Sequence, residues 1–225
     1  LQKKLRGKEI ALIPQSVTYL DPLMRVGAQV RNGNNSKKTR QEQQEAFRRF
    51  NLGPEVERMY PFQLSGGMAR RVLVSTALVC NASLIIADEP TPGMDLELAI
   101  EALQCLREFA NSGKAVILIT HDIDLAFNIA DRITVFYAGT TLEIADTADF
   151  RRGMEALRHP YSKALWNALP QNGFVPIPGF QPYAKNLPKG CLFAPRCPHK
   201  SDECESSRIP MRELRGGLVR CIHAT

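Results

Sequence analysis

Short apolar runs alternate with amphipathic stretches along the first two thirds of the chain. The apolar runs have strand length, and the amphipathic stretches repeat apolar residues every three or four positions. The predicted strands cover residues 9–13, 83–87, 115–120, 133–137 and 141–144, and the predicted helices cover residues 39–52, 66–79, 96–110, 123–130 and 160–169. Continuous apolar strands joined by helices are typical of parallel sheets with helices on both faces. The pattern therefore predicts an α/β fold with a mostly parallel sheet.

The pattern changes after about Asp149. Prolines crowd the last third of the chain, which also holds four of the six cysteines, and helical periodicity is weak there apart from residues 160–169. Such a segment buries little apolar surface and needs a cross-link, such as a disulfide or a structural metal, to stabilise its fold. We expect a main domain over residues 1–150 and a small loop-rich tail over residues 151–225.

Composition narrows the class of protein. The 225 residues are 44% hydrophobic, enough for a core, and no apolar run approaches the ~20 residues that cross a bilayer. No secretory signal is visible, so any membrane role is expected to come through partners. The net charge is +6, but Lys and Arg are scattered, which favours solvated faces over a nucleic-acid surface. Leu1 is not an initiator residue, so we expect the chain to begin partway through a longer protein.

Two motifs carry nucleotide chemistry. The apolar run at 84–87 ends in Asp88 and Glu89, and successive side chains of a strand point to opposite sides. One carboxylate can hold Mg²⁺ while the other polarises a water, as in nucleotide hydrolases. Ser65-Gly66-Gly67 opens a predicted helix, where backbone N–H groups and the positive end of the helix dipole favour a phosphate.

In this order and spacing the two motifs resemble the ATP-binding cassette (ABC) family. The resemblance implies that Asp88 binds magnesium and that Glu89 is the catalytic glutamate. Gln15 resembles the glutamine that reaches Mg²⁺, Asp95 the loop aspartate that links two subunits, and His121 the switch histidine that contacts the γ-phosphate. All five residues are predicted parts of a site for ATP and Mg²⁺.

The same resemblance implies a P-loop NTPase core with an inserted helical subdomain over residues 20–80. It also implies a head-to-tail dimer of two such domains, in which Ser65-Gly66-Gly67 serves the nucleotide held by the opposing subunit. Two departures from the family pattern stand out: Pro92-Gly93-Met94 precedes the loop aspartate, and Arg70 stands where many members have Gln. We read Arg70 as a tolerated donor whose charge helps to attract phosphate.

The phosphate-cradling loop G-x-x-x-x-G-K-[ST] does not occur in the sequence. Two explanations stay open. The chain is either a fragment of a longer subunit or a degenerate subunit that donates only its signature motif to a partner's site. In both cases we expect the 225-residue chain to bind ATP poorly by itself.

Four cysteines in the tail have the spacing C-x₅-C-x₆-C-x₁₆-C, formed by Cys191, Cys197, Cys204 and Cys221. Without a secretory signal, disulfides are the less favoured explanation, and four thiolates suit a structural zinc or an iron–sulfur cluster. Residues 190–198 and the run from His159-Pro160-Tyr161 resemble the tail of ABC subunits that import peptides and nickel. That resemblance implies a [4Fe–4S] cluster, with zinc as the alternative.

We therefore expect an ATP-hydrolysing, energy-coupling subunit of an importer for peptides or nickel complexes, peripheral on the cytoplasmic face of the cell membrane. Its implied partners are a second ABC ATPase subunit, identical or different, two transmembrane permease subunits and an extracytoplasmic solute-binding protein. The main alternative is a soluble ABC ATPase that acts on nucleic acid or ribosomes, although no nucleic acid is expected. A third interpretation is a redox or metal-binding module whose active part is the tail.

Overall fold

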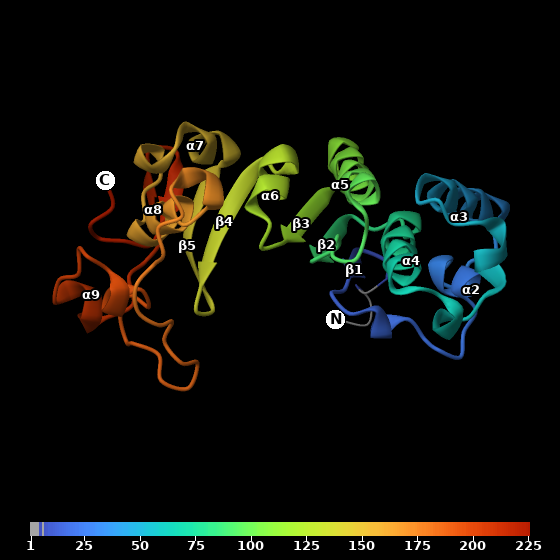
Figure 1. Cartoon of the computed structure of the whole chain (residues 1–225), viewed down its shortest axis with the longest axis horizontal. Coiled ribbons are helices and arrows are strands. Elements are labelled where there is room, and N and C mark those ends of the chain that lie inside the picture. The colour runs from blue at the N-terminus through green and yellow to red at the C-terminus, as the bar shows by residue number, and fades with distance from the viewer. Residues whose placement is uncertain (1–4, 6) are drawn as a thin grey trace. The chain divides into compact units, whose positions relative to one another are not determined.

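The computed structural model describes residue 5 and residues 7–225, which divide into two compact units, Leu1–Ile129 and Ala130–Thr225 (Figure 1). Each unit has its own sheet. Within the described residues, no helix combines the length and apolar character that a membrane span requires.

The first unit contains a parallel sheet of three strands in the order β1-β2-β3. The strands are β1 (Ile10–Ile13), β2 (Leu84–Asp88) and β3 (Ala115–Ile119). Ile13 pairs with Ala87, and Asp88 pairs with Ile119, so all three strands end at the same edge. Residues that follow these strands are thereby brought together, which is where ligands bind in open α/β sheets.

The described residues of the first unit form five α-helices (Figure 1). They are α2 (Val26–Val30), α3 (Lys37–Arg49), α4 (Gly66–Val79), α5 (Leu96–Asn111) and α6 (Ile123–Ile129), with short 3₁₀ turns at Val17–Tyr19, Pro54–Arg58 and Pro61–Gln63. Helix α4 packs on β1, α3 and α5, and α5 packs on β3. Val72, Ile85 and Leu106 lie in the core that these elements share.

The two faces of this sheet differ in their cover. Ala11 and Ile85 face the core and are buried, whereas Leu12, Ile117 and Ile119 are about half exposed, at 47%, 50% and 49%. The sequence predicts helices on both faces, but the described residues bury only one. Apolar side chains of paired strand residues therefore stay partly exposed on the other face of the sheet.

The second unit contains an antiparallel sheet in the order β4-β5-β7-β6. Its strands are β4 (Arg132–Tyr137), β5 (Thr140–Asp146), β6 (Arg212–Leu214) and β7 (Gly217–Val219), and its helices are α7 (Thr147–Arg152), α8 (Pro160–Asn167) and α9 (Glu203–Ser206), with 3₁₀ turns at Met154–Ala156, Pro170–Asn172 and Ala194–Arg196. The last two predicted strands are thus antiparallel and lie outside the parallel sheet. Ala138 and Gly139, with φ of 47° and 84°, form the tight turn that makes β4 and β5 a hairpin.

Strand pairing explains where the compact units divide. Glu143 on β5 pairs with Val219 on β7, so the 132–146 hairpin packs with the C-terminal segment. The compact division consequently falls after Ile129. The predicted division into a main domain over residues 1–150 and a tail over residues 151–225 stays a prediction.

A buried cluster of charges holds the second unit together. The Glu143 carboxylate is fully buried and accepts hydrogen bonds from the backbone N–H of Arg158 (3.0 Å) and of His159 (2.8 Å). Arg158 Nη1 lies 3.3 Å from the same carboxylate, and Arg158 Nη2 donates to Asp149 at 2.8 Å. Arg158 Nε also donates to the Leu214 carbonyl at 2.6 Å, which ties the β6–β7 hairpin to β5 and α8.

Candidate active site

Three polar segments meet at the carboxyl edge of the parallel sheet. Gln15 follows β1, Asp88 ends β2 with Glu89 directly after it, and His121 follows β3. The strands are adjacent and in register, so these residues are neighbours although they are far apart in sequence.

Glu89 and His121 form the closest contact at this edge. His121 Nδ1 lies 2.7 Å from Glu89 Oε1, and the His121 backbone N–H donates to the same oxygen at 3.1 Å. The His121 side chain is 82% exposed, whereas that of Glu89 is 15% exposed. The hydrogen bond that the Glu89 carboxylate accepts, and then its charge, raise the pKa of His121 above its usual value. The pair is therefore a carboxylate joined to an exposed imidazole whose protonated form the carboxylate stabilises.

The backbone around the pair is specialised. Glu89 has a φ of +46°, a left-handed conformation that is unusual for a non-glycine residue and that clusters at functional sites. Its N–H donates to the Ile119 carbonyl at 2.9 Å, which ties the residue to the end of β3. After His121, the Asp122 carboxylate accepts from the Leu125 N–H at 3.0 Å and caps α6. The loop that carries the histidine is thus fixed at both ends.

Arg70 fixes the segment that carries Gln15. It lies on α4, is buried, and donates from Nη1 to the Pro14 carbonyl at 2.9 Å and from Nη2 to the Gln15 carbonyl. Burial lowers the pKa of this guanidinium. The predicted role of Arg70 in attracting phosphate is wrong, because the residue is buried and its Nη1 and Nη2 donate to backbone carbonyls. The Gln15 side chain itself is exposed.

The signature turn, residues 64–68, is open to solvent where α4 begins. Ser65 and Gly66 are exposed, and Ser65 Oγ accepts from the Met68 N–H at 3.2 Å as the helix N-cap. A Cβ at Gly66 would meet nothing within 4 Å, whereas one at Gly67 would lie 3.1 Å from the Gly93 carbonyl. The turn therefore presents free backbone N–H groups to an outside ligand.

Asp95 has a structural role in this chain. Its carboxylate accepts from the Leu98 N–H at 2.9 Å and caps α5, and the residue is exposed. The Gly93 carbonyl, two residues earlier, is the atom that a Cβ at Gly67 in the signature turn would meet, at 3.1 Å. The loop after the acidic pair and the signature turn therefore lie side by side.

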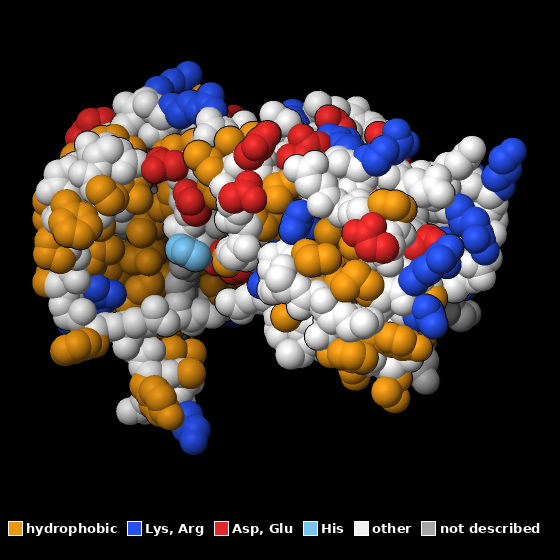
Figure 2. Space-filling view, turned by 45° about the vertical axis from the view of Figure 1, so that its right-hand side comes forward, with side chains coloured by type: hydrophobic (Ala, Val, Ile, Leu, Met, Phe, Trp, Pro, Cys, Tyr) orange, Lys and Arg blue, Asp and Glu red, His pale blue; other side chains and the backbone are white. Residues whose placement is uncertain are grey.

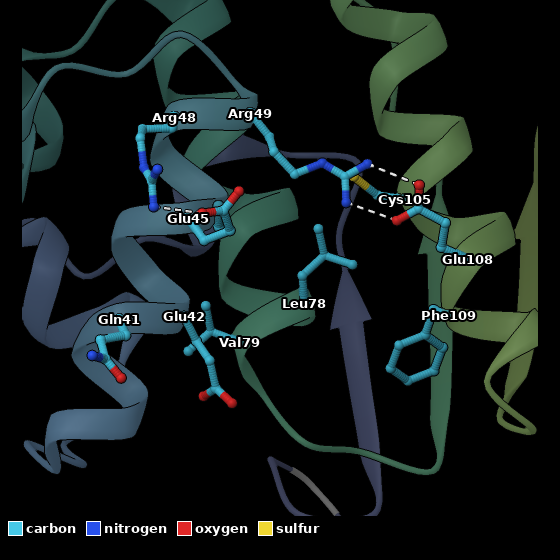
Figure 3. Close-up of a pocket in the computed structure, with 11 residues that line it drawn as sticks. Gln41, Glu42, Glu45, Arg48, Arg49, Leu78, Val79, Cys105, Glu108 and Phe109 are labelled. Atoms are coloured by element: carbon cyan, nitrogen blue, oxygen red, sulfur yellow. Dashed lines mark hydrogen bonds and ion pairs between the residues drawn. The ribbon is translucent and has the colours of Figure 1, made fainter.

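A groove with a volume of about 630 Å³ lies between α3, α4 and α5 (Figure 3). Arg49 of α3 pairs across it with Glu108 of α5 at 2.8 Å, whereas Arg48 pairs with Glu45 on α3 itself at 2.5 Å. Leu78 lies between these pairs (Figure 3). None of the described residues at the carboxyl edge of the sheet lines this groove, so it is separate from the Glu89–His121 site.

The four tail cysteines are free thiols in the second unit. Cys191 and Cys204 are buried beside Phe193, and the Cys191 N–H donates to the Cys204 carbonyl at 2.7 Å. Burial raises the pKa of the Cys221 thiol to about 11. In the described part of the chain, no three Cys, His, Asp or Glu side chains are placed to hold a metal ion. The predicted ligand set, which also includes Cys197, therefore has no support from the described side chains.

Charge is mixed on the face drawn in Figure 2. Lys and Arg side chains lie in separate groups there, with acidic and apolar side chains between them. Nucleic-acid-binding surfaces instead gather their cations into a patch or stripe.

The sequence matches two families over separate segments. The ABC transporter family matches residues 1–92, and the family described as "oligopeptide/dipeptide transporter, C-terminal region" matches residues 142–204. The oligopeptide transport ATP-binding protein OppD of Escherichia coli (strain K12) is 38% identical over 233 residues, which cover 96% of this chain and 68% of OppD. The dipeptide transport ATP-binding protein DppD of the same organism is 35% identical, over 99% of this chain and 72% of DppD.

Solved structures agree with this result. A dimeric ATP-binding cassette in a post-hydrolysis state, bound to ADP and Pi, superposes with a TM-score of 0.57 at 27% identity and covers 64% of this chain and 66% of that one. A dimeric bacterial ABC transporter cassette gives the same TM-score at 28% identity, with the same coverage. The predicted α/β cassette fold is thereby confirmed. The chain belongs to the ABC transporter family, in the group of the ATP-binding proteins of oligopeptide and dipeptide transporters.

Proposed function

We propose that this protein is the ATP-hydrolysing subunit that drives an importer for peptides. The observation that carries the proposal is the contact between Glu89 and His121 at the carboxyl edge of the sheet, in a chain that shares 38% identity with an oligopeptide transport ATP-binding protein. A carboxylate held by an exposed imidazole beside a second carboxylate, Asp88, fits the positioning of water and metal in phosphoryl transfer.

Each residue at this edge has a proposed role. Asp88 and Gln15 would hold Mg²⁺, which accepts one or two protein oxygens and completes its shell with water and phosphate oxygens. Bound there, Mg²⁺ would neutralise charge on the phosphates. Glu89 would orient and deprotonate the attacking water, since its side chain is mostly shielded and fixed by His121. His121 would contact the γ-phosphate through its exposed ring.

We infer that ATP is bound between two subunits. Ser65 and Gly66 are exposed at the N-terminus of α4, which suits a phosphate that approaches from outside. The turn would therefore serve a nucleotide held by a second ABC subunit, identical or different, and Asp95 would lie at the same interface. The solved cassette that this fold resembles is dimeric and bound to ADP and Pi, which supports the proposal.

The phosphate-cradling loop has two candidate sources in this proposal. The sequence contains no G-x-x-x-x-G-K-[ST] run. Either a segment outside these 225 residues supplies it, or the chain donates its signature turn to a partner whose own loop holds ATP. Both forms keep the chain in an ATP-driven transporter and differ in which subunit holds the nucleotide.

The assembly and its cargo are proposals as well. We expect two transmembrane permease subunits, an extracytoplasmic solute-binding protein, and a peripheral position on the cytoplasmic face of the membrane. The names of the relatives favour peptides as cargo over nickel complexes. The test is ATP hydrolysis by the reconstituted transporter: short peptides should stimulate it and nickel complexes should not. Stimulation by nickel complexes alone would contradict the peptide assignment.

A [4Fe–4S] cluster or zinc on the tail cysteines stays a proposal without structural support, because the described side chains do not form a ligand set. We assign no step of the function to it. Iron, sulfide and zinc assays on the purified full chain test it: about one cluster or one zinc per chain would support a metal role for the tail, and less than a tenth of that would exclude it.

A further inference from the structure

The second unit contains a pocket that the proposed function does not use. Its volume is about 210 Å³, and it lies between the β4–β5 turn, the segment 187–192 and the side chains of Arg208 and Arg220. A cavity of this size can hold a small ion with its first waters. The backbone at Gly190 packs directly on the backbone of Cys204 and forms one wall of the pocket. Only glycine fits there, because a Cβ would lie 2.1 Å from the Cys204 carbonyl oxygen.

The charges that line this pocket all have one sign. Lys189, Arg208 and Arg220 contribute cations, and no Asp or Glu is among its lining residues in the described part of the chain. The backbone of Glu205 packs behind Gly190, and the Glu205 carboxylate pairs with Lys200 at 2.8 Å. No ion pair is found for the three cations within the described residues.

Arg220 is held in place by neutral partners. Its Nε donates to the Thr141 carbonyl at 3.0 Å and its Nη1 to the Ile209 carbonyl at 2.6 Å. These bonds fix the guanidinium plane without cancelling its charge. Arg208 reaches Thr140 Oγ1 at 3.5 Å and lies close enough to Arg220 for the like charges to repel each other. An anion between them would relieve this repulsion.

We propose that this pocket, bounded by Lys189, Arg208 and Arg220, binds a phosphate-class oxyanion. Arginine forks and a lysine ammonium match the tetrahedral oxygens of phosphate, and such charge-assisted bonds are strong. The groove of Figure 3 provides the contrast, since its arginines are already paired with glutamates. The proposed site lies outside the Glu89–His121 site and does not depend on the proposed transport function.

Two sources can supply this chemistry: free phosphate and the phosphate of an anionic lipid headgroup. The first experiment titrates inorganic phosphate into the full chain by calorimetry at constant ionic strength, with chloride as the reference anion. We expect saturable binding, and in the variant Lys189→Gln/Arg208→Gln a dissociation constant raised at least about tenfold, which corresponds to about 1.4 kcal/mol.

The matched control is Lys163→Gln/Lys185→Gln, which removes two charges from the same unit outside the pocket. It should bind phosphate within about twofold of the parent, because screened charges elsewhere contribute little at fixed ionic strength. Trp166 is the single tryptophan and lies in this unit, so its fluorescence shows whether each variant is folded. Equal weakening in both double variants would overturn the proposal.

The second experiment compares vesicles that contain phosphatidylglycerol with vesicles of phosphatidylcholine alone. Binding of the anionic vesicles that inorganic phosphate displaces and that Lys189→Gln/Arg208→Gln abolishes would identify the lipid headgroup as the source. Binding of inorganic phosphate alone would identify free phosphate. Failure of both ligands to bind more tightly than chloride would overturn the proposal.

Discussion

Glu143→Ala tests the buried charge cluster that holds the second unit together. The substitution removes the acceptor of two buried backbone N–H groups, those of Arg158 and His159, at 3.0 and 2.8 Å. It also removes one carboxylate from the buried Arg158 guanidinium, which keeps Asp149 at 2.8 Å.

The magnitude follows from these contacts. Each buried donor left without a partner costs about 1–3 kcal/mol. Breaking a buried ion pair from one side costs about 3–5 kcal/mol, and here Asp149 offsets part of that cost. We therefore expect the free energy of unfolding of this unit to fall by about 3–5 kcal/mol, a large share of the ~5–15 kcal/mol typical of a domain.

The assay is urea unfolding followed by the fluorescence of Trp166, the single tryptophan, whose Nε1 donates to the Phe150 carbonyl at 3.1 Å. This signal reports on the second unit alone. Glu213→Ala is the control, because Glu213 is exposed on β6, and it should change stability by less than ~0.5 kcal/mol. A Glu143→Ala effect no larger than that of Glu213→Ala would refute the reasoning.

An NMR titration should give His121 a pKa above 6.5, because Glu89 stabilises the imidazolium. The stabilisation by this charged pair is lost as the pH rises through the raised pKa of His121. Glu89→Gln should return the pKa toward 6.5, and an unchanged pKa would exclude this cause. Burial lowers the pKa of His159 to about 4, so the stability of the second unit should fall by about 3 kcal/mol as the pH drops from 6.5 to 4, and His159→Gln should flatten that slope. Finally, calorimetry of the isolated 225-residue chain with ATP and Mg²⁺ should show no micromolar affinity, and binding at that level would contradict the account.

Much of the first unit could be predicted from the sequence because its signals are local. The apolar runs at β1, β2 and β3 and the helical spacing of α4 and α5 were visible without the fold. Ser65 and Asp95 precede predicted helices, and the structure makes both of them N-caps. The contact between Glu89 and His121 has no local signal, and only the family resemblance predicted that both belong to one site.

The second unit shows why the rest could not be predicted. Strands β6 and β7 are short and pair with β5 from far along the chain, a contact that periodicity does not encode. Glu143 lies between two apolar residues, Leu142 and Ile144, and that pattern was the only signal of a buried carboxylate. The sequence does not show that the Arg70 side chain is buried, where it satisfies the carbonyls that follow β1 and faces no ligand.

The most direct test of the account is the initial rate of ATP hydrolysis by the complete transporter that contains this chain. Glu89→Gln removes the proposed base while it keeps the shape of the side chain, and it should lower the rate by ~10²-fold or more. Glu97→Gln, in the exposed first turn of α5, should retain the parental rate. A Glu89→Gln transporter that hydrolyses ATP at the parental rate would contradict the assignment of this edge of the sheet as the catalytic site.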